Sequence, residues 1–304
     1  MLISIDHGNK LIKTGNKIFT SGYRESDSKP PFGDNVLKFK GKFYTLSDKR
    51  IPYMRDKTID ERFFILTLFA IAFEIDKQEC HSKDIIPISL LIGLPPAHFG
   101  AQYEKFEQYF VRGEVDEFEF NGKQQEIFIN TAIAYPQAFA AAMPVYNQIY
   151  SYPKVIVLDI GGFTADFLLV KNGQADLSAC DTLENGVIIL YNQIIARINS
   201  DFDMLLEESD IDAILNNQQT EFDEGLKEIV HESAQVFIND LFSKLRERMI
   251  DLRSGRTVFV GGGSILLRNQ IESSGKVAHP IFVDNITANA KGYELLYRTS
   301  SARR

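Results

Sequence analysis

Apolar positions along the chain fall into two patterns. Short runs of branched apolar residues end at glycine-containing turns, as at 1–6, 155–158 and 258–260. Longer stretches, such as 63–73 and 221–253, repeat apolar residues every three or four positions, as a helix with one buried face requires. Because such strands and helices follow one another along the chain, the pattern predicts an α/β protein.

The central hairpin is predicted between two buried runs, Val155 to Leu158 and Phe167 to Val170. Gly161 and Gly162 lie in the turn between them, where a side chain would obstruct a close ligand. Phosphate oxygens could then reach backbone N–H groups. Asp159 ends the first strand, where a carboxylate suits a hydrated Mg²⁺. The alternative is a plain glycine-turned hairpin with a surface aspartate, which the pattern favours less than a ligand-binding turn.

The N-terminal strand repeats this design. It ends in a second Asp-x-Gly turn, Asp6-His7-Gly8-Asn9, and 11–14 would be the return strand. Lys13 on that strand could bring an ammonium group near phosphates. As a lone feature the turn is more typical of an exposed hairpin tip, and we expect His7 to be a loop residue rather than a ligand.

Two further segments carry candidate chemistry. The triple glycine Gly261 to Gly263 follows a strand and precedes a helix that starts near Ser264, so bare backbone could lie against a flat ring; a simple turn is the alternative. The stretch 134–143 is rich in small residues and predicts a helix. Pro136 suits its first turn, which would place Gln137 at an exposed helix start.

The remaining segments carry no candidate site residues and predict structural elements only. Residues 22–46 suggest a small inserted subdomain with an irregular part and two short strands, and 221–253 suggests one long helix. The helix that begins at 187 would start facing the ligand. Residues 201–220 are acidic and polar and predict a surface excursion.

Composition describes an ordinary globular protein. A chain of 304 residues with 44% hydrophobic and 24% charged residues suggests about two domains. No apolar stretch is long enough to span a membrane and no secretion signal precedes the first strand, so we expect a cytoplasmic protein without a membrane partner. Cys80 and Cys180 have no partner cluster and are expected to be reduced core residues. The formal net charge of -8 argues against direct DNA binding through a broad basic face.

The three turns together resemble a known set of motifs. The chain has neither a P-loop nor a Gly-x-Gly-x-x-Gly sequence. The turns at Asp6, Asp159 and Gly261 instead resemble the phosphate-1, phosphate-2 and adenosine motifs of the actin, Hsp70 and sugar-kinase superfamily. Within it the chain is most similar to the bacterial actin-like ParM/StbA plasmid-segregation proteins. The segments 91–96, 135–137 and 290–293 extend this resemblance over nearly the whole length.

The resemblance implies two RNase H-like α/β domains that flank a nucleotide cleft. Residues 1–148 plus 287–304 would form domain I, and 149–286 would form domain II. It implies ATP or ADP with Mg²⁺, a homopolymeric filament, and plasmid DNA reached through a DNA-binding adaptor protein. The implied catalytic residues are Gln137, Asp159 and Asp6, of which Asp6 and Asp159 would hold Mg²⁺ through water. The implied nucleotide-binding residues are Gly8, Asn9, Lys13, Gly161, Gly162, Phe163, Thr164, Glu184, Gly186, Gly261, Gly262, Gly263 and Ser264.

One departure from the plasmid-type pattern concerns hydrolysis. Those proteins often place a glutamate where this chain has Gln137, the residue type that actins use there. A neutral amide can orient water but is a poor base, so turnover could be slow. Two alternatives therefore stay open beside a filament ATPase: a small-molecule kinase of the same superfamily, and a nucleotide-locked filament scaffold with little turnover.

Overall fold

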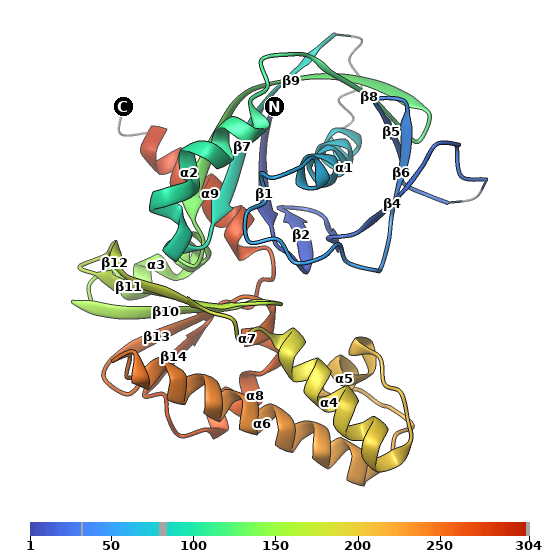
Figure 1. Cartoon of the computed structure of the whole chain (residues 1–304). Coiled ribbons are helices and arrows are strands. Elements are labelled where there is room, and N and C mark those ends of the chain that lie inside the picture. Colours follow the sequence, from blue (N-terminus) through green and yellow to red (C-terminus); the bar gives the residue numbers. More distant parts are fainter. Residues whose placement is uncertain (32, 79–83, 302–304) are drawn as a thin grey trace. The chain divides into compact units, whose positions relative to one another are not determined.

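The computed structural model of the chain describes residues 1–31, 33–78 and 84–301. Its contacts divide the chain into two compact units, Met1–Met143 with Asn289–Arg304, and Pro144–Ala288. Each unit has its own β-sheet with helices packed on it (Figure 1), so the predicted α/β class is confirmed.

The first unit contains a sheet in the order β3-β2-β1-β7-β9-β8-β5-β6-β4. The central strands β1, β7 and β9 are parallel, and the outer strands pair antiparallel. The strands are β1 (Leu2–His7), β2 (Leu11–Thr14), β3 (Ile18–Thr20), β4 (Tyr23–Ser26), β5 (Val36–Phe39), β6 (Lys42–Leu46), β7 (Ile86–Leu94), β8 (Asp116–Phe120) and β9 (Lys123–Pro136). The helices are α1 (Arg62–Lys77), α2 (Pro96–Phe110) and α9 (Ala288–Ser301).

Helix α1 is the core of this unit. Figure 1 shows the strands curving around it. Twelve of its sixteen residues are buried, which fits a helix that is apolar nearly all round. Just before the helix, Asp60 Oδ1 accepts a hydrogen bond from the Arg62 N–H at 3.0 Å.

The second unit contains a five-stranded sheet in the order β12-β11-β10-β13-β14. Strands β10, β13 and β14 are parallel, and β11 and β12 add an antiparallel meander. The strands are β10 (Lys154–Ile160), β11 (Ala165–Lys171), β12 (Gln174–Leu183), β13 (Arg256–Val260) and β14 (His279–Phe282). The helices are α3 (Tyr146–Ile149), α4 (Val187–Phe202), α5 (Glu208–Leu215), α6 (Glu224–Glu247), α7 (Gly262–Leu266) and α8 (Arg268–Ser273), and the 3₁₀ helix η1 (Ala140–Val145) precedes α3.

The acidic stretch after α4 is more ordered than predicted. Asp203 ends α4 in the left-handed conformation at φ 52°, a conformation that aspartate tolerates. Glu207 and Asp210 then form a capping box that starts α5, and its Ile211, Ile214 and Leu215 are buried. The predicted helix over 221–253 is also shorter in the structure, because α6 ends at Glu247.

The predicted helix over 134–143 is wrong. Strand β9 continues to Pro136, because its pairing with the parallel strand β7 extends to the Leu94–Pro136 pair. Gln137 follows in a turn, where its N–H donates to the Leu94 carbonyl at 2.8 Å. Ala138 then takes a positive φ of 60° before η1 begins. Gln137 is only 8% exposed, so it is a buried turn residue and not an exposed helix start.

His7 and the cysteines also differ from expectation. His7 is the last residue of β1 and is fully buried, with its Nε2 atom 2.8 Å from Thr67 Oγ1 and its ring among Phe63, Phe106 and Phe110. It is therefore a core residue and not a loop residue. Cys180 is half-buried rather than core, and residue 80 lies outside the described residues.

No helix in the described ranges combines the length and the apolar character needed to cross a membrane.

The burial of His7 makes stability depend on pH. Desolvation, and to a lesser degree the Lys57 charge, lower the pKa of His7 well below 6.5. The unfolded chain then binds a proton that the folded chain does not, so stability is complete above about pH 6.5 and falls as the pH falls below it. The limiting slope is about 1.4 kcal/mol per pH unit for one proton.

We expect His7→Phe to remove this part of the acid destabilisation. Urea unfolding of parent and variant from about pH 7.5 to about pH 5.5 measures the difference in slope. The exposed His279, changed to Phe, is the matched control. Equal slopes in the parent and the His7 variant would contradict the assignment.

Candidate functional site

Three residues predicted for the site meet in the first unit. Asp6 is 3% exposed at the end of β1. Its Oδ2 accepts from Lys13 Nζ at 3.0 Å, and its Oδ1 accepts from Gln137 Nε2 at 2.8 Å. Lys13 lies directly opposite Asp6 in the β1–β2 pair. Gln137 comes from 131 positions away, because β1, β7 and β9 are neighbouring parallel strands whose carboxyl ends share one sheet edge.

This geometry fixes what each group can do. The Gln137 amide nitrogen is held by the carboxylate, so its carbonyl oxygen is the atom left to accept a hydrogen bond from water or substrate. The Lys13 side chain is 15% exposed, and its ammonium is held at the same buried carboxylate. The arrangement therefore presents one cation and one oriented acceptor beside the turn at 6–9.

Two side chains from other segments of the first unit hold the backbone carbonyl groups of the turn at 6–9. The buried Lys57 donates its ammonium to the His7 carbonyl, and the buried Ser21 donates its hydroxyl to the Gly8 carbonyl at 2.5 Å. In a trans peptide the N–H points opposite to the preceding carbonyl. The N–H groups of Gly8 and Asn9 therefore point away from the donor groups of Lys57 and Ser21, respectively.

Asn9 has a structural task within the same turn. Its side-chain amide donates to the Met54 carbonyl at 3.1 Å and accepts from the Met54 N–H at 3.0 Å. A Cβ at Gly8 would lie 2.6 Å from the Leu11 carbonyl oxygen, so only glycine fits there. Lys57 and Ser21 were missed by the sequence prediction, because nothing in their local sequence marks them as partners of the turn.

In the turn between β10 and β11, donors from another segment likewise hold the backbone carbonyl groups. The carbonyl groups of Gly161, Gly162 and Phe163 accept from the N–H groups of Val187, Ile188 and Gly186, respectively. The N–H groups of 162–164 therefore point away from α4. A Cβ at Gly186 would lie 2.2 Å from the Gly162 carbonyl oxygen, which requires glycine at this contact.

Two expectations about this turn change. The first N–H groups of α4 are used by carbonyls of the protein itself, so the helix start does not present them to a ligand as predicted. Thr164 donates its hydroxyl to Asp166 Oδ2 at 2.9 Å, and Thr182 donates to Asp166 Oδ1 at 2.5 Å. Asp166 thus fixes the Thr164 side chain. The hydroxyl proton of Thr164 is therefore not directed at a ligand in this structure.

Contacts within the protein explain two of the three consecutive glycines. Gly261 has a φ of 87°, and a Cβ there would lie 2.2 Å from Asp159 Oδ1. A Cβ at Gly263 would lie 2.6 Å from Ile160 Cγ2 and 2.8 Å from Val187 Cγ1. At Gly262 the nearest atom is Ile286 Cδ1 at 3.4 Å, so this position has room for a side chain. Close packing therefore requires Gly261 and Gly263, and Gly262 alone is available to meet a ligand.

The residue after this run has an unsatisfied polar atom. Ser264 is 1% exposed, and its hydroxyl has no hydrogen-bond partner among the described residues. A buried hydroxyl without a partner is costly unless a ligand or water completes it. Within the second unit, this hydroxyl is therefore a group that a bound ligand could satisfy. Glu184, by contrast, is exposed between β12 and α4.

A metal site would need several ligating side chains close together. Among the described ranges, no group of three or more His, Cys, Asp and Glu side chains is arranged to hold an ion. Asp6 lies in the first unit and Asp159, 8% exposed at the end of β10, lies in the second. Joint action of these two carboxylates on Mg²⁺ through water remains a prediction.

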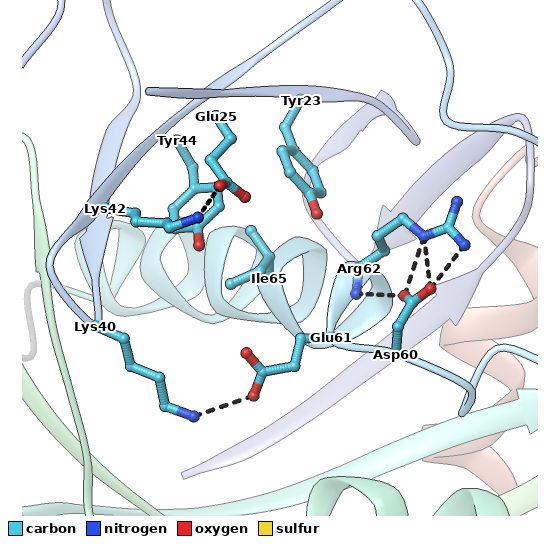
Figure 2. Close-up of a pocket in the computed structure, with 9 residues that line it drawn as sticks. All are labelled: Tyr23, Glu25, Lys40, Lys42, Tyr44, Asp60, Glu61, Arg62 and Ile65. Atoms are coloured by element: carbon cyan, nitrogen blue, oxygen red, sulfur yellow. Dashed lines mark hydrogen bonds and ion pairs between the residues drawn. The ribbon is translucent and has the colours of Figure 1, made fainter. Parts of the chain in front are cut away.

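A separate pocket of about 310 Å³ lies in the first unit between β4, the β5–β6 hairpin and the start of α1 (Figure 2). Its apolar part comes from Tyr23, Tyr44 and Ile65. Its charged rim forms three ion pairs, Lys40 with Glu61, Lys42 with Glu25, and Arg62 with Asp60. Burial raises the pKa of Tyr23 to about 12, so its hydroxyl keeps its proton. None of the sequence-predicted site residues lines this pocket.

One family model matches part of the chain. Residues 157–273 match the family model of the archaeal actin homologue MreB-like, C-terminal region. A comparison with curated protein sequences found no match for this chain.

Solved structures cover the whole chain. An archaeal actin homologue matches at 19% identity and a TM-score of 0.77, over 98% of this chain and 99% of its own. The actin-like protein Alp7A matches at 13% identity and a TM-score of 0.76, over 100% of this chain and 98% of its own. The apo form of the psk41 ParM protein matches at 15% identity and a TM-score of 0.72, over 99% of this chain and 98% of its own. Similar structures also include the archaeal homologue with ADP, Bacillus thuringiensis ParM with ATP or AMPPNP, and an Alp12 filament.

These matches confirm the predicted resemblance at the level of the fold. The chain therefore has an actin-like fold, and its residues 157–273 match the model of the C-terminal region of the archaeal MreB-like actin homologue.

Proposed function

We propose that this protein binds and hydrolyses ATP and that its nucleotide state controls assembly into a homopolymeric filament. The observation that carries the proposal is the buried Asp6 carboxylate, which holds both the Lys13 ammonium and the Gln137 amide beside a glycine turn. An ammonium, an oriented backbone turn and a water-positioning amide are the groups that phosphoryl transfer needs. Support also comes from similar folds solved with ADP, ATP and AMPPNP and from one solved as a filament.

Each group has a role in this proposal. The N–H groups of the two turns bind phosphate oxygens, and Lys13 offsets their negative charge. Asp6 and Asp159 would hold Mg²⁺, which when bound would neutralise charge on the phosphates. Gln137 keeps its nitrogen on Asp6 and accepts from the attacking water through its oxygen, which orients the water without removing its proton. Gly262 and Ser264 lie at the adenosine.

The cellular task belongs to the same proposal. A cytoplasmic filament of this fold would move or hold a cargo, for which plasmid DNA bound through an adaptor protein is the proposed case. The formal net charge of -8 favours an adaptor over direct contact with DNA. Purified filaments should not retard random duplex DNA at moderate salt.

Gln137→Ala tests the hydrolytic role. The variant leaves both carboxylates and all the glycines in place, so ATP binding should persist while phosphate release slows by roughly a hundredfold. Phosphate release and light scattering after a single addition of ATP measure both properties. Gln148→Ala removes an exposed amide and should change neither. Equal release rates in parent and Gln137 variant would refute the role.

Ser21→Ala tests the orientation of the first turn. Without the hydroxyl, the Gly8 carbonyl loses its partner and the Asn9 N–H is no longer held toward the phosphate. We expect ATP to bind about tenfold more weakly, the effect of losing one hydrogen bond of about 1.4 kcal/mol. Ser243→Ala is matched, since that hydroxyl also donates to a backbone carbonyl but on the surface of α6. Unchanged ATP affinity in both variants would remove Ser21 from this role.

Gly262→Val and Gly263→Ala separate ligand contact from packing. Gly262→Val should weaken nucleotide binding and leave the thermal midpoint nearly unchanged, because the position has room within the protein. Gly263→Ala should instead lower the thermal midpoint, because its Cβ would overlap Ile160 and Val187. Thermal unfolding and titration with a fluorescent ATP analogue measure the two effects. Full nucleotide affinity in Gly262→Val would mean that the run is only a turn.

A further inference from the structure

Charge is distributed very unevenly along this acidic chain. Residues 10–62, named the basic segment below, carry 13 Lys and Arg against seven Asp and Glu. Residues 201–232, named the acidic segment, carry eleven Asp and Glu against one Lys. The two segments belong to different units. A molecule with strong opposite charge in two places has the means to bind a second copy of itself.

The acidic segment also exposes apolar side chains. It runs from the end of α4 through α5 into the first turns of α6, which pack on one another in the second unit. Asp201 and Glu232 approach the two sides of Arg197 at 3.7 and 3.8 Å. Beside them Phe202, Met204 and Leu205 are 40%, 38% and 79% exposed. Exposed apolar residues rimmed by charge are typical of a protein interaction site.

A pocket with an apolar part is lined mainly by residues of the basic segment. The pocket of Figure 2 has Tyr23, Tyr44 and Ile65 as its apolar part, and its charged lining consists of three cations, each paired with a carboxylate: Lys40 with Glu61, Lys42 with Glu25, and Arg62 with Asp60. Lys40 and Lys42 are 54% and 48% exposed in these ion pairs. The pocket is small for a nucleotide but adequate for one or two apolar side chains. Lys38 and Arg24 are also exposed on the strands that bear the pocket.

We propose that the acidic segment of one copy docks on the basic segment of the next, with Leu205 entering the pocket beside Tyr23 and Tyr44. The contact joins two different surfaces, so each copy offers one surface to the copy before it and the other to the copy after it. A heterologous contact of this kind builds an open filament when its rotation does not close a ring. The inference rests on the proposed filament function and names the surface that the filament would use.

The chemistry favours this occupant over nucleic acid. A phosphate backbone would be attracted to the basic segment but would leave the exposed Phe202, Met204 and Leu205 unexplained and would be repelled by the acidic segment. A second copy accounts for both surfaces at once. Exposed charges are screened by salt, so assembly through this contact should weaken as ionic strength rises.

The experiment uses two full-length double variants. Lys40→Glu with Lys42→Glu reverses the charge of two cations that line the pocket, and Asp201→Lys with Glu232→Lys reverses it on the acidic segment. Each variant alone should raise the critical concentration for ATP-dependent assembly at least tenfold. An equimolar mixture should assemble again, because the reversed surfaces complement each other. Leu205→Ser, at an exposed position, should also impair assembly without affecting folding.

Matched controls carry the same charge changes elsewhere. Lys105→Glu with Lys123→Glu alters two exposed, ion-paired lysines of the first unit away from the pocket. Asp240→Lys with Glu247→Lys alters the far end of α6. Both should assemble like the parent. Nucleotide titration of every variant should give the parent affinity, because none of these residues lies in the candidate nucleotide site.

The outcomes separate the two proposals. A parent that binds no ATP, or never assembles, overturns the proposed function and this contact with it. Normal assembly of both charge-reversal variants overturns the contact and leaves the proposed function intact. Loss of assembly that the mixture does not restore also overturns it. If Lys40→Glu with Lys42→Glu lowers binding of random duplex DNA while assembly is unchanged, the basic segment serves nucleic acid instead.

Discussion

The hydrogen bonds that Asp6 accepts are the constraint on which the first unit's site depends. A buried carboxylate needs partners, because an uncompensated charge away from water costs several kcal/mol. Asp6 finds them in Lys13, directly across the hairpin, and Gln137, at the end of a distant parallel strand. This single side chain therefore links the turn at 6–9 to the end of β9. Strand order in the sheet determines where the amide lies.

The glycine-containing turns at 6–9 and 161–164 are held in shape by the same physical means. In each turn, carbonyl groups are bonded by donors from elsewhere in the same unit, Lys57 and Ser21 in the first and the N–H groups at the start of α4 in the second. Because the peptide is planar, capturing the carbonyls also sets the direction of the following N–H groups. The donors are thus oriented before any ligand arrives, which lowers the ordering cost of binding.

The acidic and basic segments, one in each unit, carry opposite net charge, and this feature is distinct from the buried candidate site. The candidate site uses buried groups with defined partners, whereas the charged residues of the proposed contact, such as Lys40, Lys42 and Asp201, are exposed and screened by salt. These contact residues are not among the groups of the candidate site. Changes at the surface can therefore be expected to alter association without altering nucleotide binding, and the reverse holds for Gln137 and Ser21.

Local sequence determined much of what surrounds the turns. Branched apolar runs predicted the strands β1, β10 and β13, and the apolar period predicted α1 and most of α6. The Asp-x-Gly and triple-glycine turns were also visible, since glycine requirements at positions such as Gly8 and Gly261 arise within a few residues.

Tertiary structure decided the rest. Small residues at 134–143 favour a helix locally, but pairing with β7 extends β9 to Pro136 and buries Gln137 against Asp6. Likewise, the polar sequence around His7 suggests a loop, whereas the packing of Phe63, Phe106 and Phe110 places the ring in the core. Lys57 and Ser21 join the site from separate segments. Such contacts form only when distant strands and helices pack together, so no local pattern encodes them.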